Sequence, residues 1–223
     1  MSHIKIITSE DGSSTLFNEH LLETYHSTKG AITESLHVYI KLGLSEIVKE
    51  ISNINILEVG MGTGLNVLLT YQFSTKCNNL FLYHALEPYP LEKEIIQELN
   101  YEQQLNDVNT FGILKKIHES NWNENIHLKN NFNFYKSLSS IQNFESDTKY
   151  DIVYFDAFGP KKQPDIWNIE ILINLFSMMS IKSCLVTYCS SGQFKRNLKE
   201  VGFKVYSFPG PPGKFEITKA VKG

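Results

Sequence analysis

Residues 55–64 have the sequence NILEVGMGTG, and the apolar segment LNVLLTYQF follows at residues 65–73. The first five residues predict a short buried strand, and the spacing of the leucines in the second segment predicts a helix. Between the two elements lie Gly60, Gly62 and Gly64. Glycine at such positions lets the backbone turn sharply and lie against a ligand that side chains would exclude. The segment therefore predicts a strand–loop–helix unit that holds a ligand at its loop.

The glycine spacing indicates which ligand. A dinucleotide-binding loop has the pattern G-x-G-x-x-G, but its last position here is Leu65. The pattern G-x-G-x-G, preceded by an acidic residue, is typical of a loop that binds S-adenosylmethionine. Glu58 is that acidic residue, and we expect it to meet the cationic amino end of the donor directly or through water. The alternative is a glycine-rich turn without a ligand, and the strand–loop–helix setting favours the donor site.

Strands and helices alternate along most of the chain, which predicts a mostly parallel sheet covered on both faces. The last two predicted strands, at 203–208 and 215–221, are joined by a turn too short for a parallel crossover, so the last strand should be antiparallel. We therefore expect an α/β fold of the class I, Rossmann-like methyltransferase type, doubly wound, with a C-terminal antiparallel strand. The other predicted strands are 55–59, 80–86, 132–135, 151–155 and 184–188, and the predicted helices are 32–51, 64–73, 88–106, 165–179 and 191–201.

Length and composition suit one globular domain, with 223 residues, 42% hydrophobic and 20% charged. We expect a single methyltransferase domain over residues 1–223, with an irregular N-terminal segment, 1–30, packed near the active site. Residues 107–131 are expected to form a helical excursion and a loop.

The N-terminus is polar, and no apolar run approaches the roughly 20 residues that cross a bilayer. The three cysteines show neither C-x-x-C pairs nor zinc spacing, so reduced thiols and no metal site are expected. These features predict a soluble, cytoplasmic protein without a membrane partner.

Charge is unevenly distributed along the chain, whose formal net charge is −3. Residues 181–223 contain eight basic and two acidic side chains, and the rest contains 13 basic and 22 acidic ones. A basic C-terminal portion is compatible with a partner that bears phosphates, and equally with a solvated lysine-rich surface.

Two further acidic residues end predicted strands. Glu87 follows strand 80–86, where an acidic residue can accept hydrogen bonds from both ribose hydroxyls of a donor. Asp156 follows strand 151–155 and should face the reacting methyl group, since ligands of open α/β sheets bind beyond the carboxyl ends of the strands. A carboxylate there can orient an amine and take its proton. The alternatives are an exposed glutamate and an aspartate that caps a turn.

Several segments, taken in order, resemble the MnmC-type tRNA methyltransferase family. The matching segments are ETYHS at 23–27, EVGMGTGLN at 58–66, EPYPL at 87–91, DAFGPK at 156–161, LVTYC at 185–189 and GPPGK at 210–214. The resemblance implies N-methylation of the aminomethyl group of 5-aminomethyl-(2-thio)uridine at the tRNA wobble position. In bifunctional members a flavin-dependent domain prepares that amine. This chain stops at Gly223, which implies a stand-alone methyltransferase without FAD, supplied with the amine by other enzymes.

The resemblance also implies a role for individual residues. Asp156 would be catalytic, Lys161 and Lys162 would contact tRNA phosphates, and the basic C-terminal portion, with Lys195, Arg196 and Lys214, would contact tRNA as well. The donor would be held by Glu58, Gly60, Gly62, Gly64, Asn66 and Glu87. Around the donor or the substrate entrance would lie Tyr25, His26, Ser27, Glu34 and Phe158.

Two positions depart from the family pattern. The segment 135–139 lacks the acidic residue that many methyltransferases direct at the adenine amine, so backbone or apolar contacts are expected there. Phe215 follows Lys214 where a second basic residue is expected. The alternative functions are a small-molecule N-methyltransferase, an aminopropyltransferase-like enzyme and a non-catalytic donor-binding subunit for tRNA processing.

Overall fold

The computed structural model describes residues 3–129 and 131–223, and it confirms the α/β fold with a mostly parallel central sheet. In the described part of the chain this sheet has eight strands, in the order β10-β11-β9-β8-β4-β5-β7-β6. Strands β9, β8, β4, β5 and β7 are mutually parallel, and β11 and β6 pair antiparallel with their neighbours. The strands are β4 (Asn53–Val59), β5 (Leu80–Leu86), β6 (Asn125–Lys129), β7 (Phe132–Ser137), β8 (Tyr150–Phe155), β9 (Met179–Thr187), β10 (Phe203–Pro209) and β11 (Glu216–Lys222).

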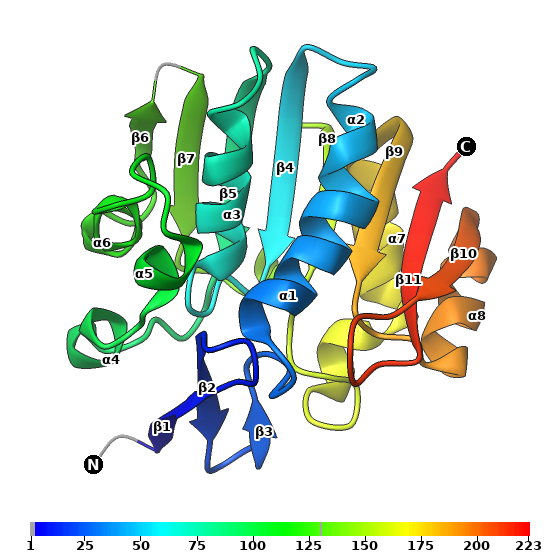
Figure 1. Cartoon of the computed structure of the whole chain (residues 1–223). Coiled ribbons are helices and arrows are strands. Elements are labelled where there is room, and N and C mark those ends of the chain that lie inside the picture. Colours follow the sequence, from blue (N-terminus) through cyan, green and yellow to red (C-terminus); the bar gives the residue numbers. More distant parts are fainter. Residues whose placement is uncertain (1–2, 130) are drawn as a thin grey trace.

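Helices cover both faces of the sheet, as the doubly wound pattern predicts (Figure 1). The helices on one face are α1 (Ala31–Ser35), the π-helix η1 (Leu36–Leu44), α2 (Ser45–Ile47), α3 (Leu65–Ser74), α4 (Lys93–Gln97), α5 (Tyr101–Leu105) and α6 (Ile113–Glu119). On the other face lie α7 (Ile169–Met178) and α8 (Gly192–Val201), with the short 3₁₀ helices η2 (Ile141–Asn143) and η3 (Pro164–Trp167).

The register of the parallel strands brings their carboxyl ends to one level. Val59 lies opposite both Leu86 and Phe155, and Leu86 lies opposite Ser137. The loops that follow β4, β5, β7 and β8 therefore leave the sheet side by side. In an open α/β sheet this is the edge where ligands bind.

The N-terminal segment is more regular than the sequence indicated. It forms a small antiparallel sheet of β1 (Ile4–Thr8), β2 (Ser14–Asn18) and β3 (Glu23–Thr24). This sheet lies below the carboxyl ends of the main strands in Figure 1. The prediction of an irregular segment was wrong because all three strands are short and β1 and β3 are only partly buried, which leaves a weak alternation pattern.

The region between β5 and β7 also differs from its prediction. The helix expected over 88–106 is two short helices, α4 and α5, and it begins late because Pro88 and Pro90 precede it. The loop expected within 107–131 contains β6, which pairs with β7 and adds an antiparallel strand at that edge.

Lys136 is a buried lysine whose ammonium lies at the carboxyl end of α6. Its Nζ donates hydrogen bonds to the carbonyls of Ile117 (2.9 Å) and His118 (2.7 Å), and it lies 4.5 Å from the ring centroid of Trp122. A cation at this helix end satisfies carbonyls that have no partner within the helix. We expect Lys136→Met to lower the free energy of unfolding by about 2 kcal/mol in urea titrations, because both carbonyls lose their donor. The exposed Lys115→Met on the same helix is the control and should leave unfolding unchanged.

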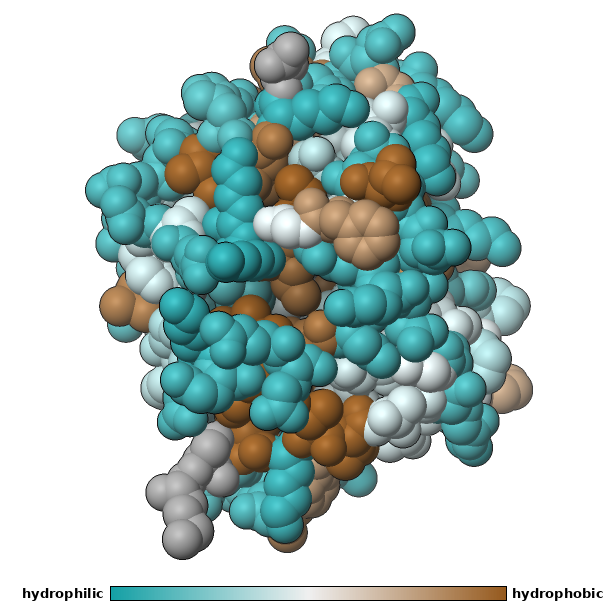
Figure 2. Space-filling model, turned by 60° about the vertical axis from the view of Figure 1, so that its left-hand side comes forward, coloured by the Kyte–Doolittle hydropathy of each residue, from teal (hydrophilic) through white to brown (hydrophobic). Residues whose placement is uncertain are grey.

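Among the residues that the structure describes, no helix is long and apolar enough to cross a membrane. The face shown in Figure 2 is largely hydrophilic, with hydrophobic residues in small separate patches.

Candidate functional site

A cavity of about 710 Å³ lies at the carboxyl ends of the parallel strands. Its wall combines the loops after β4, β5, β7 and β8 with side chains of the N-terminal sheet. Its volume lies within the usual range for sites that bind small molecules and cofactors. Of the residues that the sequence singled out, the wall contains Tyr25, Gly60, Gly62, Glu87, Asp156, Phe158 and Lys162.

The glycine loop has the backbone that its sequence predicts. Gly60 and Gly62 both have positive φ angles, +90° and +50°. A Cβ on Gly60 would lie 2.8 Å from the carbonyl oxygen of Asp156, so only glycine lets the two loops approach this closely. Gly64 also has a positive φ and begins α3, but it faces His118 rather than the cavity.

Glu87 is fixed beside this loop by backbone donors. Its carboxylate accepts hydrogen bonds from the amides of Gly62 and Tyr89, both at 2.8 Å. Burial raises the pKa of Glu87, and the two amide hydrogen bonds act in the opposite direction. The side chain is therefore held rigidly in the cavity wall, where it can accept hydrogen bonds from the hydroxyls of a ligand.

Asp156 lies in the cavity wall directly after β8. Its Oδ2 accepts a hydrogen bond from the Asn66 amide at 2.8 Å. Burial raises the pKa of Asp156 to about 6, although Tyr39, Asn66 and Lys214 each lower it. Such a carboxylate is a stronger base than an exposed aspartate and is still mostly ionised at neutral pH.

Glu58 lies behind the loop and is not among the residues of the cavity wall, and its contact with the donor, direct or through water, stays a prediction. It has no exposed surface, and its two carboxyl oxygens accept hydrogen bonds from Asn66 (3.0 Å) and the Tyr83 hydroxyl (2.9 Å). Burial raises the pKa of Glu58 well above its ordinary value. Asn66 is also buried, and its side-chain amide nitrogen donates hydrogen bonds to both Glu58 and Asp156. Glu58 and Asn66 therefore support the cavity wall from behind.

The N-terminal residues divide into two groups. Tyr25 lies in the wall, with its ring edge-on to that of Phe158 at a centroid distance of 4.9 Å. His26 is buried away from the cavity wall, hydrogen-bonded to Thr15, and burial lowers its pKa to about 4. It is therefore neutral at physiological pH, and its place beside the donor or the substrate entrance stays a prediction.

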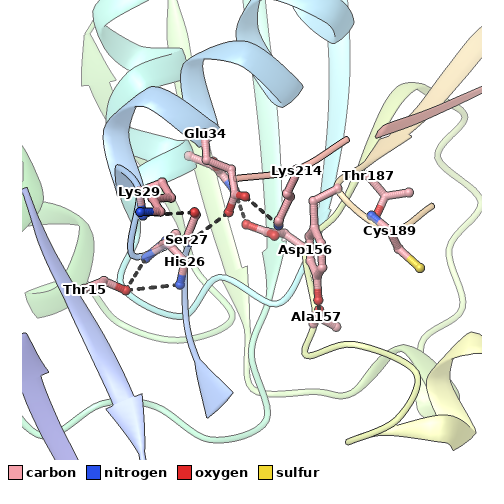
Figure 3. A network of polar contacts seen from close by, with 12 residues as sticks. Thr15, His26, Ser27, Lys29, Glu34, Asp156, Ala157, Thr187, Cys189 and Lys214 are labelled. Carbon is pink, nitrogen blue, oxygen red and sulfur yellow. Dashed lines mark hydrogen bonds and ion pairs between the residues drawn. The ribbon is translucent and has the colours of Figure 1, made fainter. Parts of the chain in front are cut away.

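A polar network connects the N-terminal segment to the C-terminal hairpin beside Asp156 (Figure 3). The Ser27 amide donates to Glu34 at 3.1 Å, and the other carboxyl oxygen of Glu34 pairs with the Lys214 ammonium at 2.5 Å. The ammonium also lies 3.8 Å from the ring centroid of Tyr188. Lys214 thus points inward to the site, whereas the family resemblance implied that it contacts a tRNA phosphate.

The other candidate phosphate contacts are spread over the surface. Lys161 is exposed, and Lys162 lies in the cavity wall. On α8, Lys195 pairs with Glu216 and donates to Ser207, and Arg196 donates to Gln193. Pairing reduces the charge that Lys195 offers to a phosphate.

Some residues at the site received no individual role from the sequence. The loop after β7 lines the cavity with residues 139–142, which include Ile141 but no acidic side chain. Tyr188 is far from Asp156 in the sequence, yet its hydroxyl donates to the carbonyl of the next residue, Ala157, at 2.8 Å. Only the tertiary fold brings these residues to the site.

The residues of the wall fit S-adenosylmethionine. Glycines allow the backbone to lie close to the donor, Glu87 offers acceptors to its ribose, and the 139–142 loop offers an apolar contact to its adenine. For the residues that the structure describes, no group of three or more His, Cys, Asp or Glu side chains could hold a metal ion.

Comparison with known proteins finds relatives that match most of this chain. Within the curated relatives, the MnmC bifunctional protein of tRNA 5-methylaminomethyl-2-thiouridine biosynthesis from Campylobacter hominis is 28% identical over 92% of this chain and 31% of its own length. The uncharacterized protein MJ0670 from Methanocaldococcus jannaschii is 29% identical over 97% of this chain and 59% of its own length. The chain thus spans about a third of the first relative and somewhat over half of the second.

Solved structures give the same result. The structure of MNMC2 from Aquifex aeolicus superposes with a TM-score of 0.78, at 26% identity, over 99% of this chain and 70% of that one. Spermidine synthase from Thermotoga maritima superposes with a TM-score of 0.59 at 12% identity, over 99% of this chain and 69% of that one, which shows a shared fold only. The sequence profile that describes S-adenosyl-L-methionine-dependent methyltransferases matches residues 97–223, which include Asp156 and the closing hairpin. The chain belongs to the family of S-adenosyl-L-methionine-dependent methyltransferases.

Proposed function

We propose that this protein transfers a methyl group from S-adenosylmethionine to the aminomethyl nitrogen of 5-aminomethyl-(2-thio)uridine at the wobble position of tRNA. The observation that carries the proposal is Asp156, a partly buried carboxylate in the cavity wall beside the glycine loop. The MnmC name of the relatives and the resemblance to MNMC2 support the choice of substrate.

The chemistry requires a neutral amine in line with the methyl group. S-adenosylmethionine supplies an activated methyl group on a positively charged sulfur. Asp156 hydrogen-bonds the substrate amine, directs its lone pair and accepts the proton that the nitrogen loses. Asn66 holds the Asp156 carboxylate in place, and Glu87 fixes the loop that carries the donor.

The geometry supports the following proposed roles of the residues. Gly60, Gly62 and Glu87 hold the donor, and the aromatic pair Tyr25 and Phe158 flanks the acceptor. Gly64, Asn66 and Glu58 support this arrangement. Lys161 and Lys162 contact tRNA phosphates at the mouth of the cavity, and Lys195 and Arg196 of α8 contact further phosphates.

The wider setting is also a proposal. Residues 1–223 act as one methyltransferase domain in the cytoplasm and need neither FAD nor a metal for this step. Other enzymes supply the aminomethyl intermediate on the tRNA.

The rate of methyl transfer is expected to rise with pH through about 6, because Asp156 accepts a proton only when it is ionised. A second rise should follow at higher pH as the substrate amine loses its own proton. The measurement is kcat across roughly pH 5–9 with saturating donor and tRNA. We call the rise of kcat near pH 6 the acid limb of the profile. A profile without this acid limb would contradict the role of Asp156 as base.

The main alternative is a small amine as acceptor, as in an N-methyltransferase or an aminopropyltransferase. Transfer of labelled methyl groups should be compared between tRNA that carries the aminomethyl group, tRNA that lacks it, and free alkylamines. Only the first tRNA should be labelled, and the apparent affinity should fall steeply with salt, as phosphate contacts require. Labelling of free amines that is insensitive to salt would favour the alternative.

A further inference from the structure

The Lys214 ammonium is held from two sides next to the candidate base. It pairs with the carboxylate of Glu34, a buried residue with only 5% of its surface exposed, and it lies over the face of the Tyr188 ring. Figure 3 shows Glu34, Lys214 and Asp156 directed toward one another from α1, the β10–β11 turn and the loop after β8. The side chain of Lys214 is about one quarter exposed, so it does not project from the surface.

Tyr188 connects this lysine to the loop that carries Asp156. Its hydroxyl donates to the Ala157 carbonyl at 2.8 Å, and the indole of Trp167 donates to the Phe158 carbonyl at 2.8 Å. Two consecutive carbonyls after Asp156 are therefore fixed by side chains. Because Lys214 packs on Tyr188, its removal would loosen one of these two supports.

The charges around Asp156 make the lysine more than a packing residue. The ionisable groups facing Asp156 are Glu34 from α1, Tyr39 from η1, Glu58 from β4, Tyr83 from β5, Tyr188 after β9 and Lys214 from the β10–β11 turn. Of these groups, the only one that is positively charged is Lys214. The Tyr39 hydroxyl lies close enough to lower the pKa of Asp156, although it makes no well-oriented hydrogen bond.

We propose that Lys214 is a positioning residue of the methyl-transfer site, which fixes the Asp156 loop through Tyr188 and offsets the negative charge of Glu34 beside the base. This inference rests on the proposed function of Asp156. It replaces the phosphate contact that the sequence assigned to Lys214. It also explains why a basic residue in this turn pairs with a buried carboxylate and does not extend into solvent.

Lys214→Met tests the proposal through kcat, KM and pH. We expect kcat to fall about tenfold while KM for tRNA changes little, because positioning is lost rather than binding. The acid limb of the kcat profile should move up by about one pH unit, because Asp156 loses a neighbouring cation. Lys214→Arg keeps the positive charge, so its acid limb should lie close to the wild-type pH.

A phosphate contact would give the opposite pattern. In that case Lys214→Met raises KM for tRNA and leaves the acid limb of the kcat profile in place. The slope of log affinity against log salt concentration then falls by about one, as for the loss of one phosphate contact. Lys222→Met is a matched control. Lys222 also lies over an aromatic ring, at 4.4 Å from the centroid of Phe176, but at the far end of β11. It should change neither kcat nor the acid limb.

Two further measurements keep the result independent of folding and of substrate. The double variant Glu34→Gln/Lys214→Met leaves no unpaired charge at this position, and if it is folded but retains full kcat, the proposal fails. The pKa of Asp156 can be measured by carbon NMR in the donor-bound protein, with Asp156→Asn for assignment. If the pKa of Asp156 is raised in Lys214→Met but the wild type does not methylate tRNA, the proposed function is refuted and the role of Lys214 beside Asp156 is retained. If the wild type methylates tRNA but the pKa of Asp156 is the same in Lys214→Met, the proposed function is retained and the role of Lys214 is refuted.

Discussion

Replacing Asp156 with asparagine is expected to lower kcat for methyl transfer by a factor of about 10²–10⁴, the usual contribution of a positioned acid or base. Asparagine preserves the shape of the side chain and can still accept a hydrogen bond from Asn66, but it cannot take a proton. The affinity for S-adenosylmethionine should stay nearly unchanged. That combination is the signature of an interaction made in the transition state.

Single-turnover kinetics and calorimetric titration of the donor measure the two quantities. Asp151→Asn is the control, since Asp151 lies at the opposite end of β8 and accepts a hydrogen bond from the Asn55 amide. It should leave both quantities at their wild-type values. If Asp156→Asn transferred methyl groups at the wild-type rate, Asp156 would not be the base.

Replacing Glu87 with alanine is expected to weaken donor binding about 100-fold, because hydrogen bonds to a charged group contribute about 1.5–3 kcal/mol each. The carboxylate fixes the amides of Gly62 and Tyr89, and we propose that it also accepts hydrogen bonds from the donor ribose. Its loss removes the ribose contact and frees the glycine loop together.

Calorimetric titration with S-adenosylmethionine measures this effect, and kcat at saturating donor should fall far less. Glu94→Ala provides a comparison, because Glu94 is an exposed residue of the neighbouring helix α4. Equal donor affinities for Glu87→Ala and the wild type would place the ribose elsewhere.

The strand ends of the site could be predicted from the sequence because they depend on local pattern. A buried apolar strand followed by glycines or an acidic residue gave Gly60, Gly62, Glu87 and Asp156, and all four lie in the cavity wall. The parallel register then brings these strand ends together.

Side-chain direction could not be predicted in the same way. Glu58 and Asp156 both stand near the ends of neighbouring strands, yet only Asp156 lies in the wall, because Asn66 and Tyr83 enclose Glu58. Lys214 has the sequence context of a surface lysine, and its partner Glu34 is 180 positions away by number. Contacts at such separation leave no periodic signal in one sequence.

The most direct test of the proposed function is nucleoside mass spectrometry of tRNA after incubation with the purified protein and S-adenosylmethionine. The tRNA is one whose wobble modification stops at 5-aminomethyluridine. The account predicts loss of the aminomethyl nucleoside and appearance of the methylaminomethyl nucleoside in equal amount, with neither change for Asp156→Asn. Donor binding with an unmodified wobble nucleoside would contradict the assignment of tRNA as substrate.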